Sequence, residues 1–338
     1  MFKKVLESLI AGQDLSHTDM LSIMHQVMGG ELTPVQIAGF LIALRAKGES
    51  VNEITAAATV MRALSTKVNI EDKTHLIDTC GTGGDGIQTF NVSTVSAFVA
   101  AAAGAKVAKH GGRSVSSTCG SADVLETLGV NVNLTAEQVA QCVNTIGIGF
   151  MFAPNHHSAM KHSAPVRREL GVRTLFNLLG PLTNPASANR QIMGVFSKDL
   201  TLKLAKVLQN LGSQQVMVVH GADGMDEISF TGDTFVAELK DGKITEYTLN
   251  PAQFGLPLHD LNLIRVENAA QSSAMILDVL AGKANTKISA ARDIVLLNAG
   301  AAIYTAGLQP SINAGIEHAA QVIDSGQALT KLQALIAA

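Results

Sequence analysis

Several residue types are scarce in this chain of 338 residues, and each scarcity excludes a class of protein. Charged residues make up only 16%, and no long run of Lys or Arg occurs, so we expect no nucleic-acid or membrane partner. The three cysteines, Cys80, Cys119 and Cys142, are too few and too widely spaced for a disulfide framework or a CxxC metal site. Neither a signal peptide nor an uncharged stretch long enough to span a bilayer occurs, which predicts a cytoplasmic protein.

Apolar residues are abundant, at 47%, which is typical of a compact enzyme with a large core. Helical spacing dominates the first 72 residues, where Thr33-Pro34-Val35-Gln36 and Ser50-Val51-Asn52-Glu53 are capping boxes that begin helices. From about residue 74, short apolar strands alternate with helices, the pattern of a mostly parallel sheet. The predicted strands cover residues 76–78, 106–109, 148–152, 192–196 and 216–219, and Asp241-Gly242 predicts an antiparallel hairpin between 234–239 and 243–249.

The fold class predicted from this pattern is α/β, with a small N-terminal helical domain and a large α/β domain with a mostly parallel central sheet. The helical domain is expected over residues 1–72, joined by part of 165–190, where Gly-Pro and Asn-Pro breaks indicate a crossing segment. The α/β domain is expected over residues 73–338.

A glycine-rich turn over residues 78–86 follows the first predicted strand and precedes a helix. Its glycines allow the backbone to approach a ligand closely, and its exposed amides favour an anion such as phosphate. Asn91, Ser93 and Thr94 could cap the helix and also donate to phosphate oxygens. A tight turn with ordinary helix capping would explain the same residues.

A second turn, over residues 109–117, follows the next predicted strand. Lys109 and Arg113 supply positive charge, while glycines and serines allow close approach and hydrogen bonding. Two such turns at successive strand ends could bind opposite ends of a doubly phosphorylated molecule. A solvated basic loop is the alternative.

Two further segments carry side chains suited to chemistry. Asp226 and Glu227 lie on a loop after a strand, where Mg²⁺ could sit between them and a polyphosphate, although an acidic surface loop would look the same. His156 and His157 have no suitably spaced metal-ligand partners. Arg167, next to Arg168, could bind a carboxylate in bidentate fashion or lie on a helix surface.

Segments across nearly the whole chain resemble those of the anthranilate phosphoribosyltransferase family, in the same order. The segments that carry the resemblance are TPVQIAGFLIALRAKGES, DTCGTGGDGIQTFNVST, KHGGRSVSS, GSADVLE, FAPNHHSAMKHSAPVRRELGVRTLFNLLGPLTNPA and GMDEIS. The resemblance implies transfer of the phosphoribosyl group of 5-phosphoribosyl 1-pyrophosphate (PRPP) to anthranilate, in tryptophan biosynthesis. It also implies Mg²⁺, two ions per monomer, a fold shared with pyrimidine-type nucleoside phosphorylases, and a homodimer formed through the helical domains.

The resemblance also implies roles for individual residues, with no side-chain base and an electrostatic role for Lys109. The PRPP-binding positions would be Gly81, Gly84, Asp85, Thr89, Asn91, Val92, Ser93, Thr94, Lys109, His110, Gly111, Gly112, Arg113, Ser114, Val115, Ser116, Ser117 and Ser121. The anthranilate-binding positions would be Gly81, Gly112, His157 and Arg167. The magnesium ligands would be Ser93, Asp226 and Glu227.

Three positions depart from the family pattern: Gly112 stands where Asn is usual, Thr118 where Lys is common, and Ser158 where Pro is usual. Gly112 cannot donate the side-chain hydrogen bond that the Asn makes to anthranilate. A related enzyme of the same fold with another acceptor, such as a nucleoside phosphorylase, is therefore an alternative. A non-catalytic relative that binds nucleic acid or phosphorylated ligands is another, against which the Asp226-Glu227 pair and the lack of basic clusters speak.

Overall fold

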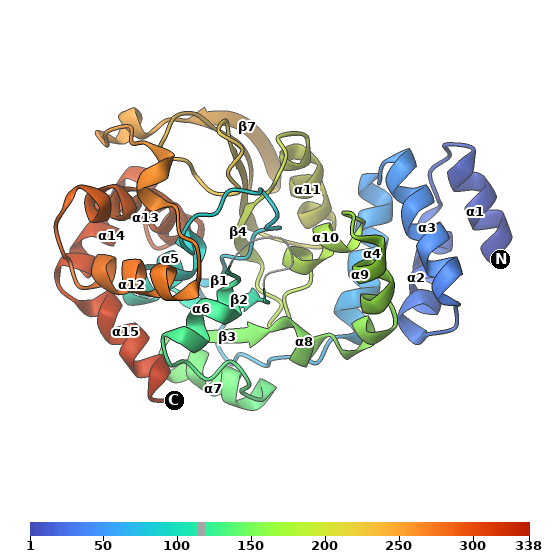
Figure 1. Cartoon of the computed structure of the whole chain (residues 1–338), viewed down its shortest axis with the longest axis horizontal. Helices are drawn as coiled ribbons and strands as arrows, with labels where there is room; N and C mark the ends of the chain where they lie inside the picture. The colour runs from blue at the N-terminus through green and yellow to red at the C-terminus, as the bar shows by residue number, and fades with distance from the viewer. Residues whose placement is uncertain (114–118) are drawn as a thin grey trace.

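The computed structural model describes residues 1–113 and 119–338. The chain begins with four helices that lie at one end of the molecule (Figure 1). Both predicted capping boxes are confirmed, because Thr33 and Ser50 accept from the backbone amides of Gln36 and Glu53, whose side chains accept in return. These helices are α1 (Phe2–Ile10), α2 (His17–Gly29), α3 (Pro34–Lys47) and α4 (Val51–Leu64).

A seven-stranded sheet follows, in the order β3-β2-β1-β4-β5-β6-β7. The strands are β1 (Leu76–Asp78), β2 (Lys106–Gly111), β3 (Ile148–Phe152), β4 (Arg190–Gly194), β5 (Gln215–Gly221), β6 (Thr234–Lys240) and β7 (Lys243–Leu249). β1 to β5 pair in parallel, whereas β6 and β7 are antiparallel, so the predicted fold class and hairpin are confirmed. The predicted strand over 192–196 was placed two residues too late, because the apolar pattern continues to Phe196 after the strand has ended at Gly194.

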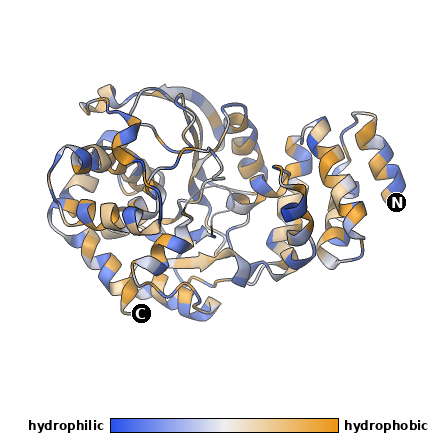
Figure 2. Cartoon of the chain, viewed as in Figure 1, coloured by the Kyte–Doolittle hydropathy of each residue, from blue (hydrophilic) through white to orange (hydrophobic). Residues whose placement is uncertain are grey.

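Helices cover both faces of this sheet. Along β5, Val216 and Val218 pack in one core with α4 and α11, and Met217 and Val219 pack in another with α5 and α13, as the alternation of a strand requires. Figure 2 shows β3 as hydrophobic along its length, as expected of a strand buried on both faces. The helices of this part are α5 (Val92–Ala102), α6 (Ser121–Thr127), α7 (Ala136–Thr145), α11 (Asp199–Asn210), α12 (Ala269–Leu280), α13 (Thr286–Thr305), α14 (Ile312–Asp324) and α15 (Gln327–Ile336).

The segment between β3 and β4 returns to the N-terminal helices (Figure 1). It contains α8 (Ala153–His156), α9 (Ala164–Leu170) and α10 (Phe176–Leu179), and α9 packs against α3 while α10 packs against α4. Because the core of the N-terminal helices continues onto one face of β4 to β6, the domain division at residue 72 remains a prediction. Within the described residues, no helix is both long and apolar enough to cross a membrane.

Candidate active site

A cavity of about 390 Å³ opens where the carboxyl ends of β1 and β2 meet α9 and α10. Ligands of open α/β sheets bind at this edge. Most of the residues expected at the site line this cavity: Gly81, Gly84, Asp85, Thr89, Asn91, Val92, Ser93, Lys109, His110, Gly111, Gly112, Arg113, Ser121, Arg167, Asp226 and Glu227. Thr94 and His157 lie outside its lining. Ser114, Val115, Ser116, Ser117 and Thr118 lie outside the described residues.

The glycine-rich turn presents free backbone amides to the cavity. Gly83, Gly84 and Gly86 have φ angles of 62°, 79° and 78°, which L side chains rarely adopt. The start of the turn is held by the Thr82 amide, which donates to the Gly194 carbonyl at 2.8 Å. Among the described residues, the amides of Gly84 and Asp85, which line the cavity, have no acceptor, so they can donate to an anion.

Asn91 does not cap α5 with its side chain, so that prediction is wrong. Its side-chain amide donates to the Cys119 carbonyl at 3.2 Å, and its Oδ1 accepts from the Ser272 hydroxyl at 2.7 Å. Asn91 therefore ties the helix start to α12 and to the end of the second turn. Thr94 does not cap the helix either: its hydroxyl is buried without a partner in the described part of the chain.

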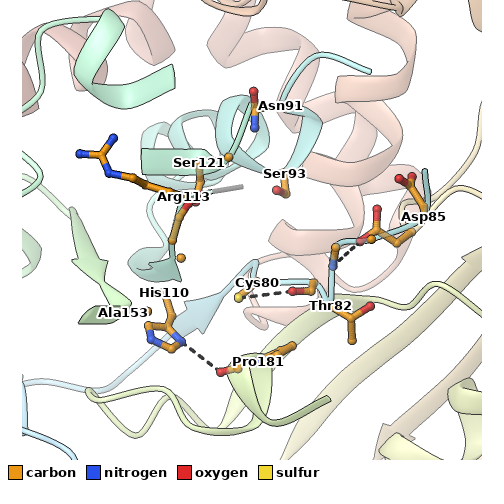
Figure 3. A pocket seen from close by; sticks show the side chains of 18 of the residues that line it. Cys80, Thr82, Asp85, Asn91, Ser93, His110, Arg113, Ser121, Ala153 and Pro181 are labelled. Atoms are coloured by element: carbon orange, nitrogen blue, oxygen red, sulfur yellow. Dashed lines mark hydrogen bonds between the residues drawn. The ribbon is translucent and has the colours of Figure 1, made fainter. Parts of the chain in front are cut away.

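Lys109 places a positive charge in the cavity beside Thr79 and Ser93. Only 3% of it is exposed, and its Nζ donates to the carbonyl and hydroxyl oxygens of Thr79 at 3.1 and 3.2 Å and to Ser93 Oγ at 3.4 Å. These hydrogen-bond partners are neutral, and the ammonium also interacts electrostatically with the buried carboxyl groups of Asp78 and Glu227. The Arg113 guanidinium, in contrast, extends away from Ser93 (Figure 3) and pairs with Asp123 and Glu126, which raise its pKa.

Three carboxylates, those of Asp85, Asp226 and Glu227, lie next to the glycine-rich turn and Ser93. Asp226 Oδ2 accepts from the Gly83 amide at 2.8 Å, and Glu227 Oε1 accepts from the Ser93 amide at 3.1 Å. Burial, with the neighbouring Asp85, raises the pKa of Asp226 to about 7. Burial and Asp226 raise the pKa of Glu227 to about 8. Crowded carboxylates of this kind favour a bound cation.

No group of three or more His, Cys, Asp or Glu side chains among the described residues is arranged to hold a metal ion. The acidic pair would therefore need ligands from elsewhere to complete a coordination sphere. Mg²⁺ commonly takes one or two carboxylates and completes its shell with water and substrate phosphates. Asp226, Glu227 and the adjacent Ser93 fit that requirement.

The part of the cavity that α9 and α10 line has side chains that suit an aromatic acid. Arg167 lies with its Cζ 5.3 Å from the centre of the Phe176 ring, and burial lowers its pKa without removing its charge. His110 Nδ1 lies 3.1 Å from the Gly180 carbonyl, and burial, together with His157, lowers the pKa of His110 to about 3. His110 is therefore neutral at physiological pH. His157 lies behind it, with the two ring centres 5.1 Å apart.

Several other residues that line the cavity could not be identified from the chemistry of their side chains. They come mainly from the crossing segment, and their apolar or small side chains carry no functional signature: Cys80, Cys119, Ala153, Phe176, Asn177, Gly180 and Pro181.

Comparison with known families assigns both parts of the chain. The glycosyl transferase family, a/b domain, matches residues 73–329, and the helical bundle domain of the glycosyl transferase family matches residues 3–65. An anthranilate phosphoribosyltransferase from Methylobacillus flagellatus is 65% identical over 98% of this chain and 96% of its own. The chain belongs to the anthranilate phosphoribosyltransferase family.

Other anthranilate phosphoribosyltransferases agree in sequence and in structure. The protein from Chromobacterium violaceum is 61% identical over 98% of this chain and 96% of its own. The crystal structure from Thermus thermophilus superimposes with a TM-score of 0.92 at 41% identity, with 98% of both chains covered. A Saccharomyces cerevisiae structure in complex with PRPP and Mg has a TM-score of 0.90 at 30% identity, covering 99% of this chain and 96% of its own. The family expected from the sequence is thus confirmed.

Proposed function

We propose that this cavity joins the phosphoribosyl group of PRPP to the amine of anthranilate and releases pyrophosphate. One observation carries the proposal: free turn amides, the buried Lys109 ammonium, an acidic pair and Arg167 line a single cavity. The first three suit a magnesium pyrophosphate, and Arg167 suits a carboxylate. A related Saccharomyces cerevisiae enzyme has been crystallised with PRPP and Mg, and another crystal of it contains 4-fluoroanthranilate.

The residues act by positioning and by charge. The anomeric carbon loses pyrophosphate as the anthranilate nitrogen approaches, and the ribosyl group gains oxocarbenium character. Lys109 and the amides of the glycine-rich turn stabilise the negative charge that builds up on the departing pyrophosphate. Arg167 holds the carboxylate of anthranilate so that its amine faces the sugar. The neutral His110 places no competing charge on the aromatic ring.

A pyrophosphate-release assay tests the reaction. With PRPP and Mg²⁺ present, release should depend on anthranilate, and N-(5-phosphoribosyl)anthranilate should accumulate in equal amount. Release of a free base from a nucleoside, with inorganic phosphate as co-substrate and no pyrophosphate formed, would instead establish the nucleoside phosphorylase alternative. Absence of turnover with retained PRPP binding would establish a non-catalytic binding protein.

Magnesium would be held by Ser93, Asp226 and Glu227 together with the pyrophosphate oxygens. Two ions per monomer would balance the negative charge of the pyrophosphate and the two carboxylates. When bound, the ions would neutralise the negative charge on the departing pyrophosphate. Changing Asp226→Asn together with Glu227→Gln should lower kcat at least 100-fold and raise the Mg²⁺ concentration for half activity. Glu169→Gln, on an exposed position of α9, should change neither. Near-normal turnover of the double variant at saturating Mg²⁺ would reject this metal role.

We propose a homodimer formed through the N-terminal helices. Ile10 and Val35 are 73% and 81% exposed, and Ile42 is 40% exposed, so α1 and α3 present apolar side chains to solvent. Sedimentation equilibrium should give twice the chain mass. Val35→Asp with Ile42→Asp should shift the protein to monomers, and a monomeric unmodified protein would contradict the proposal.

A further inference from the structure

Arg173 contacts the wall of the cavity from outside. It lies between α9 and α10, and its Nη2 donates to the carbonyl oxygen of Gly84 in the glycine-rich turn. Its Cζ lies 4.1 Å from the centre of the Phe196 ring, so the guanidinium plane is held by stacking as well as by hydrogen bonding. Arg173 itself is absent from the cavity lining, whereas Gly84 and Asp85 belong to it.

This contact determines which way the Gly84–Asp85 peptide faces. In a trans peptide the carbonyl oxygen and the following N–H point in opposite directions, and none of the described peptides is cis. Arg173 holds the Gly84 oxygen from outside the cavity lining, and Asp85 belongs to that lining, so the oppositely directed Asp85 N–H points toward the cavity. No group in the described part of the chain accepts from that N–H, so it can donate to a ligand.

The turn needs such an anchor. Gly83 and Gly84 both have left-handed φ angles and no side chain that could hold the peptide by packing. The turn is fixed by the Thr82 amide, which donates to the Gly194 carbonyl, by the Gly83 amide, which donates to Asp226 Oδ2 at 2.8 Å, and by the Ile87 amide, which donates to Asp85 Oδ1 at 2.9 Å. None of these bonds involves the peptide between Gly84 and Asp85. Among the described residues, Arg173 is the one group that bonds to the Gly84–Asp85 peptide.

We propose that Arg173 is a positioning residue that turns the Asp85 amide toward the pyrophosphate of the sugar donor. Arg173 lies six residues after Arg167, in the segment that returns to the N-terminal helices. The same segment therefore carries the group for the acceptor carboxylate and the anchor for the donor turn. The identity of the ligand rests on the function proposed above, but the orientation of the peptide does not.

Steady-state kinetics of Arg173 variants provide the first measurement. Arg173→Ala should raise the KM for PRPP about tenfold, because the freed peptide can rotate, while the KM for anthranilate stays within twofold of the unmodified enzyme. Arg173→Lys should be intermediate, because it keeps the charge but loses the planar stack on Phe196. Arg168→Ala is the matched control, since it removes an exposed guanidinium from the same segment and should leave both KM values unchanged.

Hydrogen–deuterium exchange of peptides covering residues 81–88 separates positioning from direct contact. In the ligand-free protein, Arg173→Ala should raise exchange in this segment severalfold, and magnesium pyrophosphate should protect it less than in the unmodified protein. Unchanged exchange overturns the positioning role, even if the KM for PRPP rises, because Arg173 would then contact the anion directly. If the unmodified enzyme shows no anthranilate-dependent pyrophosphate release, the proposed function fails, and the exchange comparison still decides the role of Arg173.

Discussion

Gly112 borders the cavity with space beside it. Among the described residues, no atom lies within 4 Å of a Cβ built on Gly112, and the φ of Gly112 lies outside the left-handed region, so the backbone accepts a side chain there. Gly112→Asn should therefore add one hydrogen bond to anthranilate and lower its KM about fivefold, for a net bond of about 1 kcal/mol. The measurement is the KM for anthranilate at saturating PRPP, with Gly112→Ala as the control. Equal KM values for the Asn and Ala variants would show that the side-chain amide makes no such bond.

Arg167 lines the cavity, and under the function proposed above it binds the acceptor carboxylate. Arg167→Ala should raise the KM for anthranilate about 30-fold, since a hydrogen bond to a charged group contributes about 2 kcal/mol. The KM for PRPP should stay within twofold, because the glycine-rich turn and Lys109 are untouched. Arg168→Ala, at the exposed neighbouring position, should alter neither constant. An equal rise in both KM values would count against the assignment of Arg167 to the acceptor.

At the scale of elements, the end of β4 supports both the glycine-rich turn and the acidic loop. The Gly194 carbonyl accepts from the Thr82 amide at 2.8 Å, and a Cβ at Gly194 would lie 1.5 Å from the Asp226 carbonyl oxygen. Gly194→Ala must therefore push the acidic loop away from the turn. We expect kcat to fall at least 100-fold with the helical circular dichroism retained. In the part of the chain that the structure describes, no atom lies within 4 Å of a Cβ built on Gly232, so Gly232→Ala should keep full activity. Full activity of Gly194→Ala would refute the support role.

The sequence predicted those elements whose determinants are local. The capping boxes at Thr33 and Ser50, the glycine-rich turn after β1 and the hairpin at Asp241-Gly242 each depend on neighbouring residues, and all are present. Side-chain hydrogen bonds to residues that are distant in the sequence could not be predicted. The Asn91 side chain accepts a hydrogen bond from the Ser272 hydroxyl, 181 residues away along the chain. No local pattern distinguishes an Asn that caps a helix from one that bonds to another helix.

At the scale of the whole molecule, buried histidines lie where the N-terminal helices meet the sheet. His110 lies one residue before the end of β2, and His156 and His157 lie shortly after β3. The His156 carbonyl accepts from the Thr66 amide, just after α4, at 2.8 Å. The Nε2 atoms of these histidines have no hydrogen-bond partner among the described residues. Burial is the main cause that lowers the pKa of His110 to about 3 and that of His157 to about 4.

The folded protein therefore holds these imidazoles neutral, whereas the unfolded chain protonates them near pH 6.5. A lowered folded-state pKa gives stability that is complete above about pH 6.5 and is lost as the pH falls toward 4. Each histidine should contribute a slope of up to about 1.4 kcal/mol per pH unit in that range. Urea unfolding at pH 7.5, 6 and 5 measures how the free energy of unfolding depends on pH. His157→Gln should reduce this slope by about the contribution of one histidine. His17→Gln, at an exposed position, should leave the slope unchanged, and an undiminished slope in His157→Gln would mean that His157 is protonated without cost in the folded protein.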